Sequence, residues 1–152
     1  MSDKLDVVGI GNAMVDAIIP SNQSEIEKHE INRDSMNLID ENLKNNLHES
    51  YSIREMAGGG SLGNSMFGIT SFGGNGSFIG KIKNDEIGVY LQKDMIREGL
   101  KFPLGFTSPD ISTGCCTIFV EEDGTRTMCT FLGAGTLIAV SYTHLTLPTT
   151  PV

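Results

Sequence analysis

In the stretch EMAGGGSLGNS, residues 55–65, three consecutive glycines join a predicted strand to a predicted helix. Glycine loses more backbone freedom on folding than any other residue, so a run of glycines is expected where side chains would obstruct a close approach. Apolar residues recur at helical spacing from Leu62 onward, and Ser61 is the predicted N-cap. Backbone N–H groups at a helix N-terminus can bind ligand oxygens directly. The loop is therefore either a small-ligand site or a flexible connector.

Two better-known glycine motifs fit the sequence poorly. A P-loop would need GxxxxGK[ST], but Gly80-Lys81 is followed by isoleucine. GIGNAM, residues 9–14, supplies the first two glycines of a dinucleotide-binding fingerprint, but Met14 stands where the third is required. The residues after Met14 alternate as in a strand, whereas that fingerprint opens a helix.

An amide and a carboxylate follow the first predicted strand, LDVVGIG at 5–11, which has the continuous apolar pattern of a buried strand. After it the pattern alternates, and Asn12 and Asp16 are predicted to share one face with Met14 and Ile18. A carboxylate can accept hydrogen bonds from two vicinal hydroxyl groups, and an amide both donates and accepts. These residues are either a site for a polyol or, in the case of Asp16, a simple contact with water.

Strands and helices alternate through the middle of the chain, which predicts an α/β sheet. The alternating strands near 14–20, 35–39 and 114–132 do not suit a buried parallel sheet, so they indicate a second, smaller β layer with one open face. The last of these is predicted to be a hairpin that turns at EEDGT. Further strands are predicted at 76–82 and 102–106. Four helices are predicted: one begins with a capping box at 24–27, one has Asp40 as its N-cap, one begins at Ser61, and one carries the apolar stripe Ile87, Leu91 and Met95.

Composition limits the classes of function. The 152 residues suffice for one domain with a core, and a net charge of −8 argues against nucleic acid or an anionic membrane as partner. The odd number of cysteines, at 115, 116 and 129, suits a reducing compartment, and their spacing suggests no metal site. No signal peptide or membrane span is evident, so the cytoplasm is the expected location.

From residue 5 to about 135 the chain resembles the N-terminal portion of the ribokinase-like (PfkB) carbohydrate and nucleoside kinases, and within them the adenosine-kinase-like branch. The motifs that carry the resemblance are GIGNAMVD (9–16), GGSLGNS (59–65), FIGKIKNDEIG (78–88) and STGCCTIFVEEDGTRTMCTFLGA (112–134). The resemblance implies a truncated α/β fold: part of a central, mostly parallel sheet with flanking helices, plus a small β-sheet lid. The lid would take the strands near 14–20, 35–39 and 114–132, within one kinase domain spanning 1–135.

The resemblance also implies roles for particular residues. Asn12 and Asp16 would hold the hydroxyl groups of a ribose-type sugar. The residues that would shape the rest of the sugar pocket are Gly59, Gly60, Ser61 and Asn64. The residues of the lid face that would cover a base or an apolar sugar face are Met128, Thr130 and Leu132, and Arg126 would approach the phosphates.

Kinases of this family transfer the γ-phosphoryl group of ATP, with Mg²⁺, to a primary hydroxyl group of a nucleoside or sugar. Their catalytic base belongs to a Gly-Ala-Gly-Asp motif. Here GAG at 133–135 is followed by Thr136 and comes at the end of a lid strand, so it does not match. The catalytic and ATP-binding part is therefore expected to be absent and the chain inactive alone. The alternative is a non-catalytic module that binds a ribose ligand or a partner. In a complete protein the lid could also form a homodimer.

Residues 136–152 differ in composition from the rest. VSYTHLTLPTTPV, at 140–152, resembles translated sequencing-adapter DNA, so this tail is expected to be non-native or disordered. A truncated sheet is also expected to expose an unpaired edge and apolar surface.

Overall fold

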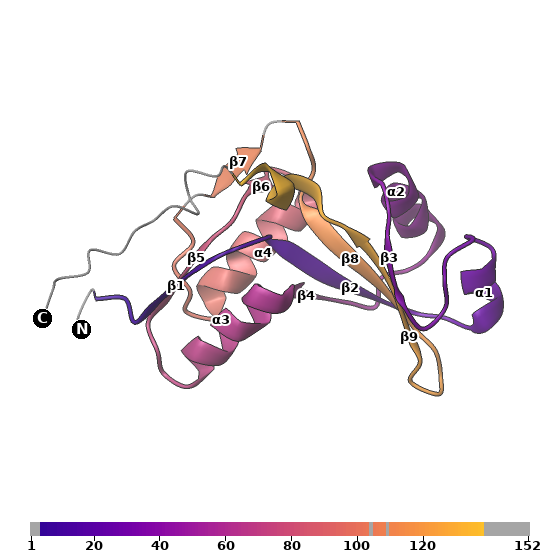
Figure 1. Cartoon of the computed structure of the whole chain (residues 1–152), viewed down its shortest axis with the longest axis horizontal. Helices are drawn as coiled ribbons and strands as arrows, with labels where there is room; N and C mark the ends of the chain where they lie inside the picture. The colour runs from indigo at the N-terminus through magenta and orange to yellow at the C-terminus, as the bar shows by residue number, and fades with distance from the viewer. Residues whose placement is uncertain (1–3, 104, 109, 139–152) are drawn as a thin grey trace, which may run out of the picture.

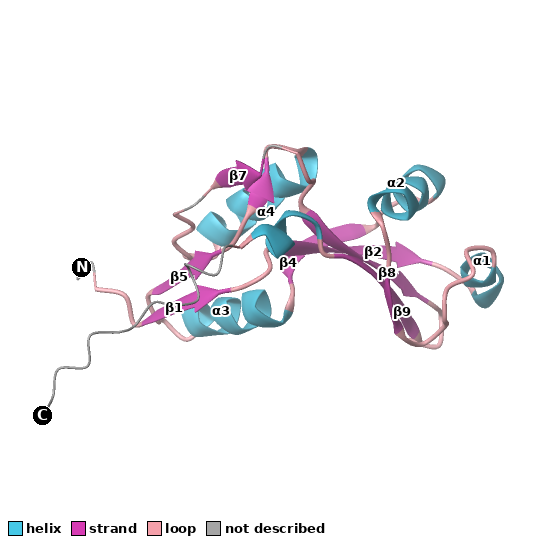
Figure 2. Cartoon of the chain, turned by 45° about the horizontal axis from the view of Figure 1, so that its top comes forward, coloured by secondary structure: helices cyan, strands magenta, loops and turns pink. Residues whose placement is uncertain are grey.

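A five-stranded mixed sheet projects from an α/β region (Figures 1 and 2). The computed structural model describes residues 4–103, 105–108 and 110–138. The strand order is β3-β9-β8-β2-β4, in which β2 and β8 run parallel, as do β3 and β9, while β8–β9 and β2–β4 are antiparallel. The strands are β2 (Met14–Pro20), β3 (Met36–Leu38), β4 (Glu55–Gly59), β8 (Gly114–Val120) and β9 (Arg126–Phe131).

The predicted strands of the smaller β layer are confirmed, and β4 joins them as a fifth. The hairpin β8–β9 turns at Asp123-Gly124 as expected, with Gly124 at φ +86°. The Glu121 N–H donates to the Thr125 carbonyl at 3.0 Å, which closes the turn. Alternation within these strands therefore identified a real sheet.

Two helices cover one face of the five-stranded sheet, α1 (Gln23–Glu27) and α2 (Glu41–Ser50). The predicted N-cap of α2 is confirmed, because Asp40 accepts from the Leu43 N–H at 2.8 Å. The predicted capping box of α1 exists but begins two residues earlier, with Asn22 and Glu25 as its members. The core between helices and sheet contains Ile19, Ile26, Leu47, Phe119 and Cys129.

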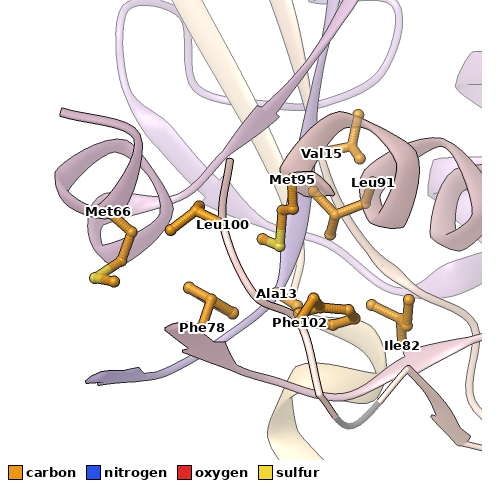
Figure 3. Close-up of a cluster of buried hydrophobic side chains, with 9 residues drawn as sticks. All are labelled: Ala13, Val15, Met66, Phe78, Ile82, Leu91, Met95, Leu100 and Phe102. Carbon is orange, nitrogen blue, oxygen red and sulfur yellow. The ribbon is translucent and has the colours of Figure 1, made fainter. Parts of the chain in front are cut away.

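The other region contains α3 (Ser61–Ser71) and α4 (Glu86–Arg97) with two short parallel pairs. β1 (Val7–Ile10) pairs with β5 (Gly76–Ile79), and β6 (Ile82–Lys83) pairs with β7 (Phe106–Ser108). Its buried cluster, drawn in Figure 3, consists of Ala13, Val15, Met66, Phe78, Ile82, Leu91, Met95, Leu100 and Phe102. The inner stripe predicted for α4 is confirmed at Leu91 and Met95.

The prediction that the first strand is buried is wrong for its first half. Val7 and Val8 are exposed, because within the described residues β1 pairs only with β5 and leaves its other edge open. The predicted strand at 76–82 is divided into β5 and β6, and the strand predicted at 102–106 begins only at Phe106. The expected open edge and exposed apolar side chains are thus both present.

The segment Gly133–Leu137 forms a short 3-10 helix, η1, where the chain leaves β9. A methyl group on Gly133 would lie 2.4 Å from the Ser112 carbonyl oxygen, and one on Gly135 would lie 3.0 Å from Cβ of Asn12. Close packing therefore accounts for these glycines. Thr136 and Leu137, the first residues of the predicted tail, belong to η1, while 139–152 lie outside the described residues.

Candidate functional site

The helices leave the second face of the five-stranded sheet open. On β2, Val15, Ala17 and Ile19 are buried on the helix-covered face, whereas Asp16 and Ile18 on the opposite face are half-buried. Successive side chains of a strand point to opposite faces, so this difference follows from the period of two. The open face is where the sheet can contact something other than its own helices.

Strand register places a polar row across this open face. Asp16 pairs with Cys116 on β8, and Cys116 pairs with Thr130 on β9. Directly paired residues share a face, and the Cys116 Sγ lies 3.4 Å from the Thr130 Oγ1. Sequence reasoning identified Asp16 and Thr130 but missed Cys116 between them, because lateral strand order is needed to place it.

An apolar row lies beside the polar one. Register aligns Ile18 on β2 with Ile118 on β8 and Met128 on β9. At the edge of the sheet Met36 and Leu38 of β3 are 56% and 66% exposed. The open face thus places a polar row, in which Cys116 and Thr130 are buried and Asp16 is half-buried, next to an apolar row.

The carboxylate of Asp16 lies directly against the glycine stretch. A methyl group on Gly59 would be 2.3 Å from the Asp16 Cγ and within 2.5 Å of both carboxylate oxygens. The Asp16 carboxylate therefore occupies the space that a side chain at position 59 would need, which gives a reason for glycine there within the protein itself. The two features that the sequence singled out, Asp16 and the glycine run, meet at this point.

Asp16 is half-buried, and burial raises the pKa of its carboxyl group above its usual range. Within the described part of the chain it makes no hydrogen bond or ion pair that would offset this burial. A desolvated carboxylate without a partner is unfavourable in the free protein. It is therefore suited to accept hydrogen bonds from a ligand, and the interpretation that it simply faces water does not explain its burial.

A pocket of about 280 Å³ opens where β2 and α3 begin, and its lining includes Asn12, Met14, Gly60 and Ser61. The predicted N-cap, Ser61, is wrong: Gly60 is the N-cap, with φ +78°, and no side chain caps the helix. A positive φ favours glycine, so the chain enters α3 one residue earlier than a serine cap would allow. The first N–H groups of α3 are left available beside this pocket.

One predicted site residue lies differently from expectation: Asn12 precedes β2 rather than sharing its face, and its side chain packs against Gly135. Asn64 is exposed on the first turn of α3, where its N–H donates to the Gly60 carbonyl at 2.9 Å. Arg126 is exposed at the hairpin end of β9, four residues along the strand from Thr130.

Leu132 follows β9 and is the N-cap of η1. It lines a separate hollow of about 290 Å³, together with Leu38 and Thr130. Thr130 thus belongs to the polar row and also borders this apolar hollow. Of the three lid-face residues that the resemblance suggested, Met128 and Thr130 share the face of Asp16, and Leu132 extends that face toward η1.

Two residues of α4 that the sequence did not single out contact the strand leading to the glycines. The Asp94 carboxylate accepts from the Gly58 N–H at 2.8 Å, and the Tyr90 hydroxyl donates to the Met56 carbonyl. The available signal was a carboxylate within the inner stripe of α4, next to Met95. Its partner is 36 residues away in sequence, so the contact had no local pattern.

In residues 4–138, apart from 104 and 109, no group of three histidine, cysteine or acidic side chains is arranged to hold a metal ion. None of the described helices has the length and apolar composition needed to cross a bilayer.

The fold and this site define the class of protein: an α/β domain with a small open sheet, of the ribokinase-like, adenosine-kinase-like type. The sequence matches the pfkB family of carbohydrate kinases over residues 5–140, and the chain belongs to that family. A comparison with curated protein sequences gives no match.

Solved structures agree with this assignment. The chain is similar to adenosine kinase from Sinorhizobium meliloti, with 35% identity and a TM-score of 0.80 over 91% of this chain and 42% of that one. It is similar to a probable sugar kinase from Rhizobium etli, with 31% identity and a TM-score of 0.79 over 90% and 42% of the two chains. Anopheles gambiae adenosine kinase shares the fold at 22% identity, with a TM-score of 0.77 over 89% and 41%. The chain spans about two fifths of the length of these proteins.

Proposed function

We propose that the chain supplies the acceptor-binding part of an ATP-dependent kinase that phosphorylates a primary hydroxyl group of a nucleoside or sugar. The observation that carries the proposal is the half-buried Asp16 carboxylate, which lies against Gly59 and has no hydrogen-bond or ion-pair partner among the described residues. Support for the substrate class comes from two similar proteins, one named an adenosine kinase and the other a probable sugar kinase.

In this proposal Asp16 accepts hydrogen bonds from two neighbouring hydroxyl groups of the sugar ring. Those bonds replace water lost on burial, so they are strong in a half-buried site. The N–H groups at the start of α3 and the Asn12 amide supply further polar contacts beside the same pocket. Together these groups fix the ring, and a fixed ring brings its primary hydroxyl group into a constant position.

The open face would act as a lid. Met128, Ile118 and Ile18 offer an apolar row that can cover a base or an apolar sugar face. Covering the ligand excludes water, which strengthens the polar contacts and prevents wasteful hydrolysis. We propose the same role for Leu132 at the end of this face and a weaker, phosphate-proximal one for Arg126.

ATP and Mg²⁺ belong to the proposed reaction. Thr136 follows the GAG at 133–135 where the catalytic aspartate of the family motif would be needed. In our proposal the base and the phosphate donor site lie in the further length that the similar kinases possess, and the 152-residue chain has no turnover of its own.

The test uses the complete protein, in which we propose that this sequence forms the N-terminal part. We expect ATP-dependent phosphorylation when it is supplied with adenosine, other ribonucleosides or free sugars, and none from the 152-residue chain. Binding of a ribose compound without turnover by the complete protein would favour the non-catalytic alternative. Failure to bind any of these compounds would contradict the proposal.

A further inference from the structure

The outer edge of β4 is closed by a helix instead of another strand. β4 is the last strand of the five, so its main-chain groups that face away from β2 have no strand partner among the described residues. Two side chains of α4 occupy that edge: the Tyr90 hydroxyl donates to the Met56 carbonyl, and the Asp94 Oδ2 accepts from the Gly58 N–H at 2.8 Å. Tyr90 and Asp94 are one helical turn apart, matching the two-residue spacing of Met56 and Gly58.

The contact at Gly58 is buried and tightly packed. Both Gly58 and Asp94 are buried, and a methyl group on Gly58 would lie 2.6 Å from the Phe67 ring and 2.9 Å from the Asp94 Oδ2. Gly58 is thus held between an α3 ring and an α4 carboxylate. A hydrogen bond to a buried charged group is among the stronger contacts available to a main-chain N–H.

We call the hydrogen bond from the Gly58 N–H to the Asp94 carboxylate the clamp. The clamp lies one residue away from the proposed ligand contacts. Gly58 precedes Gly59, against which the Asp16 carboxylate lies, and Gly60, which is the N-cap of α3 beside the pocket. A shift of the main chain at Gly58 would therefore move the surface that supports Asp16. It would also move the N-terminus of α3.

We propose that Asp94 is a positioning residue for the acceptor site. It does not touch the ligand. Through the Gly58 N–H it holds residues 58–60 in the place that aligns the Asp16 carboxylate with the first turn of α3. The inference rests on the proposed function, because it assigns Asp94 a part in binding the acceptor.

Arg97 provides a matched control. Its guanidinium contacts the other carboxylate oxygen, Asp94 Oδ1, and its side chain is 67% exposed. Replacing Arg97 leaves Oδ2 free to accept from Gly58. The clamp and the surface ion pair can therefore be separated by two substitutions on the same helix face.

The kinetic experiment uses the complete protein. Asp94→Ala is expected to raise the KM for the acceptor about tenfold, as loss of a charged hydrogen bond would, with kcat and the KM for ATP little changed. Asp94→Asn keeps an oxygen that can accept from Gly58 and should restore most of the affinity. Arg97→Ala should leave the acceptor KM unchanged. A purely structural role would lower the active fraction, and hence kcat, without changing the KM.

Amide hydrogen exchange provides a readout that does not depend on activity. Asp94→Ala should accelerate exchange in the peptide containing residues 58–60, while Arg97→Ala should not. Faster exchange with an unchanged acceptor KM would overturn the positioning role and leave the proposed function intact. Unchanged exchange would overturn the clamp itself. A wild-type protein that binds no nucleoside or sugar would overturn both proposals.

Discussion

The two faces of the five-stranded sheet differ in what covers them, although the same strands form both. On β8, Cys115, Thr117 and Phe119 are completely buried toward α1 and α2. Their neighbour Ile118 is half-buried on the face of Asp16. A period of two thus places alternate residues of one strand in different surroundings, one set in the helix-covered core and the other on the face to which we propose that a ligand binds.

The ionisable groups on the two faces also differ in their partners. On the helix-covered face, His48 of α2 is half-buried, and its Nε2 lies 2.9 Å from the Thr117 Oγ1. On the open face the half-buried Asp16 carboxylate has no partner within the described residues. A buried polar group that is satisfied serves the fold, whereas one left unsatisfied calls for another explanation. Ligand binding is the explanation that we propose for Asp16.

The largest effect should come from neighbouring substitutions on β8. Phe119→Ala leaves a cavity in the helix-covered core, so the free energy of unfolding should fall by about 3–5 kcal/mol. Ile118→Ala, one residue earlier on the open face, should cost only about 1 kcal/mol, because its side chain is half-exposed. Urea denaturation of the complete protein measures both. Equal losses would mean that the two faces do not differ in the proposed way.

A smaller effect is expected from a methyl group on the glycine run. Gly59→Ala must displace the Asp16 carboxylate, since the added carbon would be 2.3 Å from its Cγ, and acceptor affinity should fall about tenfold. Gly68→Ala in α3 is the control, because its added carbon meets no atom within 4 Å. That variant should keep its affinity and gain up to about 1 kcal/mol of stability from helix propensity. Calorimetric titration with the acceptor measures both affinities. Undiminished binding by Gly59→Ala would show that the Asp16 carboxylate is not part of the acceptor site.

The smallest effect is on the pH dependence of stability, where the two faces should have opposite signs. Burial raises the Asp16 pKa above 3.8, so its contribution is present below pH 3.8 and is lost as pH rises through the raised value. Burial, and then the charge of Lys44, lower the His48 pKa below 6.5, so its contribution is present above pH 6.5 and is lost as pH falls through the lowered value.

Two variants separate these contributions. Asp16→Asn should gain stability relative to wild type as pH rises above 3.8, and His48→Gln should gain relative to wild type as pH falls below 6.5. Unfolding free energies measured across that range test both trends. A reversed trend for either variant would show that burial does not set the direction of the pKa shift of that group.

Local pattern was sufficient to find the strands of the small sheet, whereas the meeting of Asp16 with the glycine run was suggested only by the family resemblance, which gave both a place in one pocket. Alternation is a property of each strand alone, so β2, β8 and β9 could be predicted. The lateral order that places Cys116 between Asp16 and Thr130 is tertiary, and so is the contact of Asp94 with Gly58. For the same reason the exposure of β1 was missed, since an apolar strand at an open edge has the pattern of a buried one.

The most direct measurement is a thermodynamic cycle, in which binding constants are compared when the protein, the ligand, or both are changed. The complete protein and its Asp16→Asn variant are each titrated with the acceptor that supports turnover and with analogues lacking one ring hydroxyl group. If Asp16 holds the ring hydroxyl groups, removing one should weaken binding to wild type about tenfold and have little effect on the variant. An equal loss of affinity in both proteins would contradict the account.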